Sequence, residues 1–403
     1  MEIQAVDQAD FQQLILPQVR DWILLNRGEN ASQLALRGAP KGIPLSLACQ
    51  QIALLQKAKH KLPTWSKAGC LLPKRAYEQC SGEAIAAAKP WKSGIHALDL
   101  TCGLGVDSWT MAQHYQHVTS LEPDPDLAKV VAHNADLLDC KNQKVLCQTA
   151  EAFLSEYQGP IFDLAYIDPD RRNPSGGRVH ALKDCQPNIL QLLPQLTKVA
   201  KRILIKTSPM LDISALKNDF DGKAKVWVLS EGGECKELLA ELNASTSHQQ
   251  TAAIFIRKGK TYAFEGEAKQ KLDAFAAIGA YLYEADTALY KADLAVSWYG
   301  SVNNPLEGGL TSKNGYFTAE IDNTSFHGHR FRVLEVFPWK PSILRKALKS
   351  KGIKKIQVSR RDFDLPMETI RKQLKMPEGG KYFLLLTNVE GSGRTAILAE
   401  RLV

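Results

Sequence analysis

The sequence predicts an α/β fold, in which a mostly parallel, doubly wound sheet follows a helical region and precedes smaller α+β units. Two observations predict it. Between about residues 91 and 265, short apolar runs alternate with helix-length segments, which is typical of βαβ units. Over residues 1–90, apolar side chains recur at spacings of three and four, which is the pattern of amphipathic helices.

The N-terminal region, residues 1–90, is expected to be helical. One apolar helix face is formed by Phe11, Leu14, Ile15, Val19, Trp22 and Ile23. Pro17 interrupts this pattern, so we expect a kink or break there. A second helix is expected over Leu45–Lys61, with Pro63 ending it, and a third from near Ser81.

The sheet domain, residues 91–265, is expected to contain seven short apolar strands. They are Ala97–Leu100, His117–Glu122, Lys144–Gln148, Phe162–Ile167, Arg202–Lys206, Lys225–Leu229 and Ala252–Ile256. The last two or three suit the antiparallel edge that such sheets commonly carry.

The remaining residues are predicted to form two small α+β units, at 266–322 and at 323–403. The expected strands are Leu294–Trp298, Tyr316–Ile321, Arg330–Val336, Lys355–Val358 and Tyr382–Leu386. The expected helices are Lys269–Leu282, Pro341–Lys351 and Pro366–Leu374.

Positive charge is concentrated at the end of the chain. The 403 residues carry a net charge of +8. Residues 330–403 contain 17 Lys or Arg and 7 Asp or Glu, a net charge of +10, so the other 329 residues carry −2. This asymmetry predicts a polyanionic partner, with structured RNA first, bound by residues 323–403. The alternative is a lysine-rich surface that only keeps the protein in solution.

Other compositional features narrow the function. No run of about 18 apolar residues predicts a membrane span, and the acidic start Met1–Asp7 does not suit a signal peptide. We therefore expect a cytoplasmic protein without a membrane partner. The eight cysteines form no C-x-x-C pair, so we expect reduced thiols and no metal.

The main chemical signal is the glycine loop Leu98–Ser108, which follows a strand and opens a helix. Gly103 and Gly105 allow a sharp turn and a close approach to a ligand. The helix behind them offers free N–H groups. Asp99 can accept a hydrogen bond from the ammonium group of a methionine moiety.

Three further features follow in the register that this fold requires, all at carboxyl ends of strands. Glu122, with Pro123 after it, follows the second strand, where an acid hydrogen-bonds ribose hydroxyls. Glu151 follows the third strand, where it can reach an adenine amino group. Asp168 and Pro169 follow the fourth. Together with the loop, these features predict S-adenosylmethionine as the cofactor.

The main rival is a dinucleotide-binding oxidoreductase. Its G-x-G-x-x-G fingerprint needs a third glycine where this chain has Ser108. The step Asp168-Pro169-x-Arg171 also has no role in such an enzyme.

The chain resembles bacterial S-adenosylmethionine-dependent methyltransferases that carry a THUMP-like C-terminal domain. The resemblance spans almost the whole chain and rests on Lys61–Trp65, Glu78–Ser81, Asp99–Ser108, Tyr166–Arg172, Lys206–Asp212 and Gly233–Leu239. It implies a Rossmann-like class I methyltransferase sheet, a ferredoxin-like domain at 266–322 and a THUMP-like domain at 323–403. Cys102 stands where relatives usually have a third glycine, which could restrict the loop.

The segment Gln79–Ser81 also resembles the stretch that packs over the methionine part of the cofactor in nucleic-acid methyltransferases. Ser81 with Glu83 equally suits a helix cap. The residues expected to bind the cofactor are therefore Gln79, Ser81, Asp99, Thr101, Gly103, Gly105, Asp107, Glu122, Pro123, Glu151 and Asp168.

The methyl acceptor is expected beside Asp168, Pro169 and Arg171, the predicted catalytic residues. Methyl transfer needs in-line geometry, so positioning carries most of the rate. In amino-methylating enzymes an Asp-Pro pair holds the acceptor N–H, and an aromatic residue stacks on a flipped base. Arg171 instead suits a phosphate or carboxylate, although an exposed salt bridge is its alternative reading.

The cysteines do not support covalent pyrimidine chemistry. The 5-methyluridine enzymes use a cysteine near strand five, but residues 206–210 contain none. Cys185 lies between the expected fourth and fifth strands. Cys235 is expected at the start of a helix, in a packing role.

RNA base methylation is the function that these patterns favour. A methyltransferase for a small molecule or a protein, and a non-catalytic protein that binds S-adenosylmethionine and RNA, are the alternatives. The Asp168-Pro169 pair argues against the second alternative, and the basic C-terminal region argues against the first.

Overall fold

The computed structural model describes residues 8–170, 182, 185–243, 250–266, 275–302, 308–312 and 314–402. The chain forms two compact units, and the division falls within two strands. Unit 1 comprises residues 1–250 and 256–262, and unit 2 comprises 251–255 and 263–403. No helix among the described residues is both long and apolar enough to cross a membrane.

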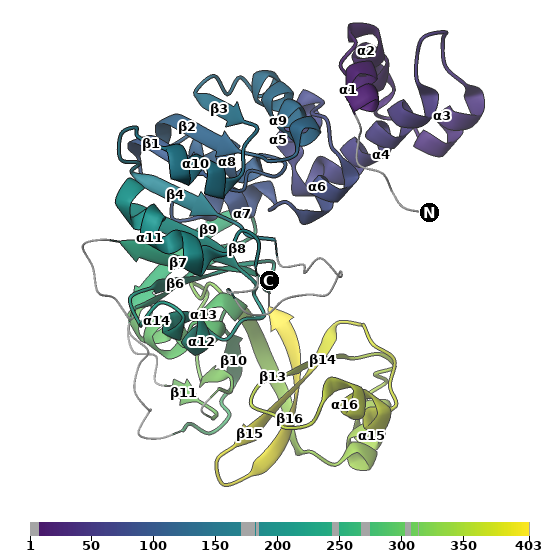
Figure 1. Ribbon diagram of the computed structural model, residues 1–403. Coiled ribbons are helices and arrows are strands. Elements are labelled where there is room, and N and C mark those ends of the chain that lie inside the picture. Colours follow the sequence, from purple (N-terminus) through teal and green to yellow (C-terminus); the bar gives the residue numbers. More distant parts are fainter. Residues whose placement is uncertain are drawn as a thin grey trace. The chain divides into compact units, whose positions relative to one another are not determined.

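A run of helices opens the described part of unit 1 (Figure 1). They are α1 (Gln8–Leu14), α2 (Pro17–Asn26), α3 (Ala31–Arg37), α4 (Leu45–Lys61), α5 (Pro63–Ala68), α6 (Lys74–Gln79) and α7 (Glu83–Ala88). The predicted break is present, because α1 ends at Leu14 and Pro17 begins α2. The predicted helix Leu45–Lys61 is confirmed with the same bounds.

The helical region shares its core with the sheet domain. Buried Trp65 belongs to the same apolar cluster as Val106 and Val130, which lie on helices that cover the sheet. The Asn134 side chain also accepts from the Leu71 N–H at 2.8 Å and donates to the Leu71 carbonyl at 2.9 Å. Helices α1 to α7 are therefore packed onto the sheet domain as part of one unit.

A nine-stranded sheet follows, in the order β3-β2-β1-β4-β5-β7-β6-β8-β9. Its strands are β1 (Gly94–Asp99), β2 (Tyr115–Leu121), β3 (Gln143–Leu146), β4 (Leu164–Ile167), β5 (Arg202–Thr207), β6 (Lys225–Glu231), β7 (Glu234–Asn243), β8 (Thr251–Arg257) and β9 (Lys260–Gly266). Strands β1 to β5 are parallel, and β7 is antiparallel to both β5 and β6. The predicted parallel sheet and its antiparallel edge are both present.

Helices between these strands complete the doubly wound pattern (Figure 1). They are α8 (Val106–Met111), α9 (Pro125–Leu137), α10 (Ala150–Glu156), α11 (Ile189–Val199) and α12 (Ile213–Asn218). Because β1 to β5 are parallel, the segments after their carboxyl ends meet at one edge, where ligands bind in this fold.

The predicted helix at Cys235 is wrong, because Glu234–Asn243 is strand β7. Gly232 and Gly233 both have positive φ, 61° and 85°, and they turn the chain between β6 and β7. The sequence of β7 is rich in Glu, Leu and Ala, which favour helices. Pairing with strands on both sides overrides that local preference.

Unit 2 contains a seven-stranded sheet in the order β11-β12-β10-β13-β16-β15-β14. Its elements are β10 (Tyr281–Glu284), α13 (Thr287–Lys291), α14 (Ala295–Val302), β11 (Gly308–Leu310), β12 (Phe317–Ala319), β13 (His329–Pro338), α15 (Pro341–Ser350), β14 (Gln357–Arg360), α16 (Met367–Leu374), β15 (Tyr382–Val389) and β16 (Gly393–Leu402).

Two predictions in unit 2 are wrong. Leu294–Trp298 was expected as a strand, but Ala295–Val302 is helix α14, in which Trp298 packs edge-on against Phe255 with ring centroids 5.9 Å apart. Residues 269–274 of the expected helix Lys269–Leu282 lie outside the described residues; residues 275–280 are not helical, and Leu282 belongs to strand β10. Tertiary packing decided both elements.

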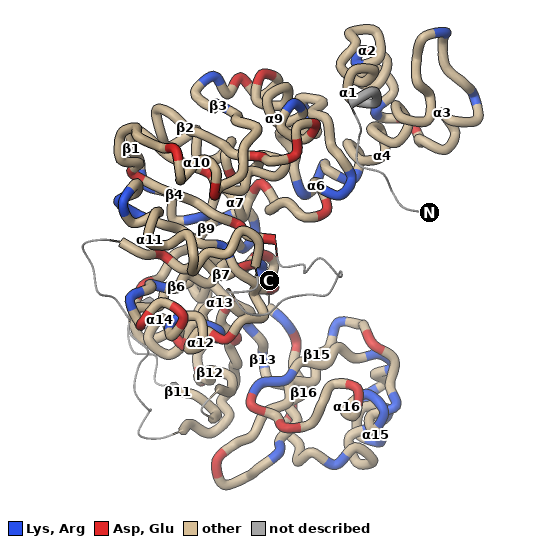
Figure 2. The backbone as a smooth tube through the Cα atoms, in the orientation of Figure 1, with Lys and Arg blue, Asp and Glu red and all other residues tan. Residues whose placement is uncertain are grey.

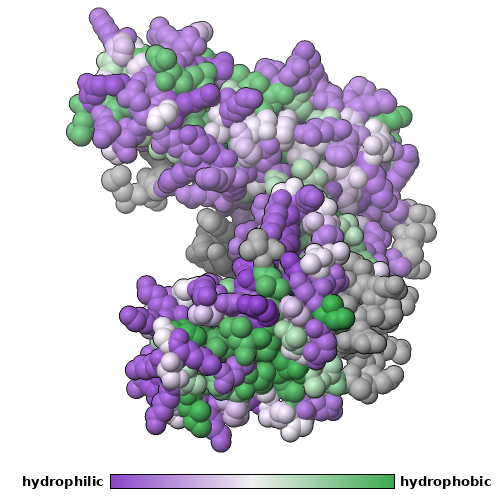
Figure 3. Space-filling view, turned by 180° about the vertical axis from the view of Figure 1, so that it is seen from behind, coloured by the Kyte–Doolittle hydropathy of each residue, from purple (hydrophilic) through white to green (hydrophobic). Residues whose placement is uncertain are grey.

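The sheet of unit 2 is apolar on both faces. Leu384 and Leu386 of β15 pack in one cluster with α15 and α16, whereas Leu385 between them joins a second cluster, as the two-residue period of a strand requires. Figure 3 shows hydrophobic residues grouped on this unit.

The expected boundary between residues 322 and 323 remains a prediction about domains. In the structure, β10 on one side of it pairs with β13 on the other. The two expected α+β parts thus contribute to one continuous sheet.

Candidate functional site

Asp99 ends strand β1 and is completely buried. Its Oδ1 accepts from the Thr101 N–H at 3.0 Å, and its Oδ2 accepts from the Ser108 hydroxyl at 2.5 Å. Burial raises the pKa of Asp99 to about 7, even though both hydrogen bonds oppose the rise. The carboxyl group therefore holds the two ends of the glycine loop together.

The glycine loop has an open face. Gly103 has a φ of +56°, and a Cβ built there would meet nothing within 4 Å. Gly105 has a φ of +92°, and a Cβ there would meet Val131 Cγ1 at 2.9 Å. Glycine at 105 is thus required by conformation and packing, whereas Gly103 leaves space beside the loop.

Glu122 directly follows strand β2 and is buried against this loop. Its Oε2 accepts from the Gly103 N–H at 2.9 Å, and its Oε1 accepts from the Asp124 N–H at 3.0 Å. Burial raises the pKa of Glu122. Pro123 and Glu151 are exposed, and Glu151 lies in the first turn of α10.

Asp168 follows strand β4 and is tied to the loop. Its N–H donates to the Thr101 hydroxyl at 2.6 Å, and its Oδ2 accepts from Lys206 Nζ of β5 at 2.5 Å. Burial alone would lower the pKa of Lys206, but the Asp168 and Glu237 carboxylates raise it above its usual value. Asp168 is thereby held from two sides, beside the open face of the loop.

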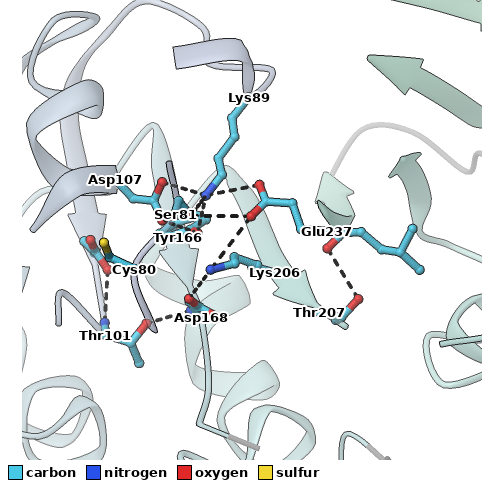
Figure 4. Close-up of polar contacts among 12 residues, drawn as sticks. Cys80, Ser81, Lys89, Thr101, Asp107, Tyr166, Asp168, Lys206, Thr207 and Glu237 are labelled. Atoms are coloured by element: carbon cyan, nitrogen blue, oxygen red, sulfur yellow. Dashed lines mark hydrogen bonds and ion pairs between the residues drawn. The ribbon is translucent and has the colours of Figure 1, made fainter. Parts of the chain in front are cut away.

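Lys206 also connects Asp168 to a buried network of charges (Figure 4). Lys206 Nζ lies 3.8 Å from Glu237 Oε2, and Lys89 Nζ lies 3.3 Å from Glu237 Oε1. Lys89 Nζ also lies 2.6 Å from Asp107 Oδ1. Three carboxylates and two ammonium groups thus form one chain of contacts with a formal charge of −1 when all are ionised.

Two hydroxyl groups complete the network. Tyr166 donates to Asp107 at 2.8 Å and accepts from Lys89 at 2.8 Å. Ser81 donates to Asp107 at 3.2 Å. Burial would raise the pKa of Asp107, but Lys89 and Lys206 hold it below its usual value. Burial raises the pKa of Glu237 against the same two lysines.

The structure brings most of the predicted site residues together. Asp99, Thr101, Gly103, Glu122 and Asp168 are linked through the hydrogen bonds just described, and Ser81 and Asp107 belong to the buried network. Gln79 lies exposed at the end of α6, and buried Pro169 follows Asp168. Arg171 lies outside the described residues.

The cysteines contribute little to these contacts, although the Ser108 hydroxyl lies 3.5 Å from Cys102 Sγ. All eight are free thiols, and Cys185 and Cys102 are buried. Burial raises the pKa of Cys102 well above its usual value. Among the described residues, no group of three or more His, Cys, Asp or Glu is placed to hold a metal ion.

The sequence reasoning gave no role to four members of the network, Lys89, Tyr166, Lys206 and Glu237. A signal was present for one of them. Lys206 is the penultimate residue of β5, in which all six residues are buried, and a charge in a buried strand requires a partner. The partner, Glu237, could not be identified because β7 was not expected.

A protein family, a solved structure and a curated protein are similar to parts or all of this chain. Residues 328–401 match the family model described as "THUMP domain-like". A crystal structure of a putative methyltransferase from Porphyromonas gingivalis W83 superposes with a TM-score of 0.79 at 24% identity, covering 98% of this chain and 99% of that one. An uncharacterized RNA methyltransferase of Staphylococcus aureus strain MRSA252 is 28% identical over 162 residues, which is 39% of this chain.

These likenesses establish the fold. The chain has the α/β class I methyltransferase fold, the fold of S-adenosylmethionine-dependent enzymes, and it ends in a THUMP-like domain, as predicted. The matched region spans about a third of the length of the staphylococcal relative, 31%.

Proposed function

We propose that the protein is an S-adenosylmethionine-dependent methyltransferase that modifies a base of structured RNA. One observation carries this proposal: Asp168 is fixed between Thr101 of the glycine loop and buried Lys206. A carboxylate held there is placed to accept a hydrogen bond from a methyl acceptor while the donor lies along the loop.

The loop and its neighbours fit the proposed cofactor. The open face at Gly103 leaves room for a ligand, and Glu122 lies beside that face. Glu122 is proposed to reach the ribose hydroxyls and Glu151 the adenine, while Asp99 and Asp107 support the loop from within. When bound, the cofactor supplies an electrophilic methyl group. The chain's own residues orient the acceptor, and the ion pair with Lys206 holds the Asp168 carboxylate in place.

The structure does not leave the Asp99 carboxyl group free for the direct contact with the cofactor that the sequence suggests. Asp99 has no exposed surface, and both of its oxygens already accept hydrogen bonds. We propose that Asp99 acts mainly by shaping the loop, and that the backbone of the loop faces the methionine end.

The THUMP-like domain is proposed to bind the RNA. Its helices α15 and α16 carry five of the 17 cations of residues 330–403, and Figure 2 shows Lys and Arg on both helices. Polycationic surfaces bind RNA through its phosphates. A cytoplasmic location accords with this role and remains a prediction.

The central test is methyl transfer from tritiated S-adenosylmethionine to RNA, protein and small metabolites from cells that lack the gene. We expect label in the RNA fraction. Label only in protein or metabolites would contradict the RNA substrate, and no label in any fraction would contradict the enzymatic activity.

Lys206→Met tests the role of Asp168 in the same assay. Loss of the ammonium group releases the Asp168 carboxylate, and misplacement by about 1 Å lowers rates by about 100-fold. Lys201→Met is a matched control, because Lys201 is exposed just before β5 and pairs with Asp163 at 2.7 Å. A lower rate with unchanged cofactor affinity is expected for Lys206→Met alone. Equal methylation rates in both variants would contradict the proposed role of Lys206 in holding Asp168.

A further inference from the structure

A second concentration of positive charge lies outside the THUMP-like domain. The segment Asn30–Tyr77 contains eight Lys or Arg and no Asp or Glu. It lies within the 329 residues whose total net charge is −2. Acidic residues elsewhere in that region offset its positive charge. An acid-free stretch of this length has no internal partners for its cations.

Most of these cations are exposed. Lys57, Lys59, Lys67 and Lys74 all have exposed side chains, and none forms an ion pair among the residues that the structure describes. Lys61 differs, because its Nζ donates to the Tyr77 carbonyl at 2.6 Å and so fastens α4 to α6. Figure 2 shows Lys and Arg gathered around α6.

Three cations of the helical region meet in one groove, which we call the helical groove. It has a volume of about 470 Å³ and lies between α2, α4 and α5. Its lining consists of Leu24, Leu25, Arg27, Gly28, Leu55, Lys59, Pro63, Ser66 and Lys67. The lining therefore combines three positive charges with apolar surface and contains no carboxylate. Leu25 is 84% exposed at this site.

The next helix, α6, which Lys61 fastens to α4, leads to the candidate site. Helix α6 begins at Lys74 and ends at Gln79, two residues before Ser81 of the buried network. Arg75 Nη2 lies 3.9 Å from Asp170 Oδ2, two residues after Asp168. A ligand bound along α5 and α6 would thus run towards the acceptor side of the site.

We propose that the helical groove is a second RNA-binding surface, which holds the phosphodiester backbone of the substrate. Arg27, Lys59 and Lys67 contact phosphates, while Leu25 and its apolar neighbours contact ribose or base faces. The residues that line this surface lie between Leu24 and Lys67, outside the THUMP-like domain. The proposal rests on the proposed RNA methyltransferase function and adds the element that positions the RNA.

The test uses the full chain and a fluorescein-labelled bacterial tRNA preparation, with binding followed by anisotropy over a series of KCl concentrations. Lys59→Gln/Lys67→Gln removes two proposed phosphate contacts. Lys144→Gln/Lys198→Gln is the matched control, since both of these lysines are exposed in unit 1 on β3 and α11. Calorimetric binding of S-adenosylmethionine should be unchanged in both variants, which verifies folding.

We expect the groove variant to bind the tRNA roughly tenfold more weakly than the wild type at low salt. Its plot of log affinity against log salt should be less steep by about 1.5, because each of the two lost phosphate contacts contributes about 0.7–0.9 to that slope. The control should match the wild type. Equal slopes in all three proteins would overturn the proposal while leaving the proposed function intact.

Two other outcomes would also overturn it. If the wild type bound no tRNA and methylated no RNA, the proposed function would fail and this surface with it. If the groove variant lost binding only to vesicles that contain phosphatidylserine, the groove would serve an anionic membrane and not RNA.

Discussion

The buried charge network of unit 1 and the exposed ion pairs of unit 2 use charged side chains in opposite ways. In unit 1, Lys89 has no exposed surface in its side chain, and Asp107, Lys206 and Glu237 are each no more than 11% exposed. In unit 2, Lys351 and Glu335 pair at 2.7 Å with side chains 45% and 40% exposed. Buried charges depend on each other, because water cannot replace a lost partner. Exposed charges are readily solvated, so their pairs contribute little.

This difference indicates why the basic unit 2 and the site in unit 1 should respond differently to substitution. In unit 1 each charge holds a neighbour in place, and the network connects the residue that follows α7 with α8, β4, β5 and β7. In unit 2, exposed pairs such as Lys351–Glu335 hold no buried partner in place. Substitutions in the buried network should therefore have larger effects than substitutions in the exposed pairs.

Lys89→Met should cause the largest loss of stability. The substitution leaves Asp107 and Glu237 without the ammonium group that both contact, and removing one partner of a buried pair typically destabilises a protein by about 3–5 kcal/mol. Urea unfolding, followed by fluorescence, measures the change. Lys92→Met serves as control, because Lys92 is 65% exposed and lies 3.8 Å from Glu241. Similar midpoints for the two variants would contradict the coupling within the network.

Asp99→Asn should change how stability depends on pH. Burial raises the pKa of Asp99 to about 7, so between about pH 4 and 7 the folded protein binds a proton that the unfolded chain has released. The Asp99 contribution to stability is therefore present below pH 4 and falls as pH rises, by up to about 1.4 kcal/mol per pH unit. The difference in unfolding free energy between variant and wild type should follow this change across the window. A difference that stays constant from pH 4 to 7 would show that Asp99 titrates normally.

Lys351→Gln should have the smallest effect. The Lys351–Glu335 pair is half exposed, and such pairs contribute about 0.5 kcal/mol. Thermal unfolding in low and high salt measures the change, and it should vanish at high salt because the charges are screened. A loss of unfolding free energy as large as that expected for Lys89→Met would contradict the difference between buried and exposed charges.

Local patterns in the sequence determined much of the fold and part of the site. The glycine loop, the acid after β2 and the Asp168-Pro169 step all lie at carboxyl ends of strands, as expected, because each motif is defined by a few neighbouring residues. The fold class and the THUMP-like domain were also predicted. The individual cofactor contacts of Gln79, Glu122 and Glu151 remain predictions.

Tertiary structure alone decided which charges meet. Lys89, Asp107, Lys206 and Glu237 come from four separate elements, and their pairing depends on β7 lying between β5 and β6. The local sequence of β7 favours a helix, so no local signal could place Glu237 opposite Lys206. In the same way, the sequence identified Asp99 as a ligand-facing acid, but burial against Thr101 and Ser108 turned its carboxyl group into a support for the loop. Sequence patterns specify the backbone turns and strand ends, while contacts between distant strands decide which side chains lose water and so which charges need each other.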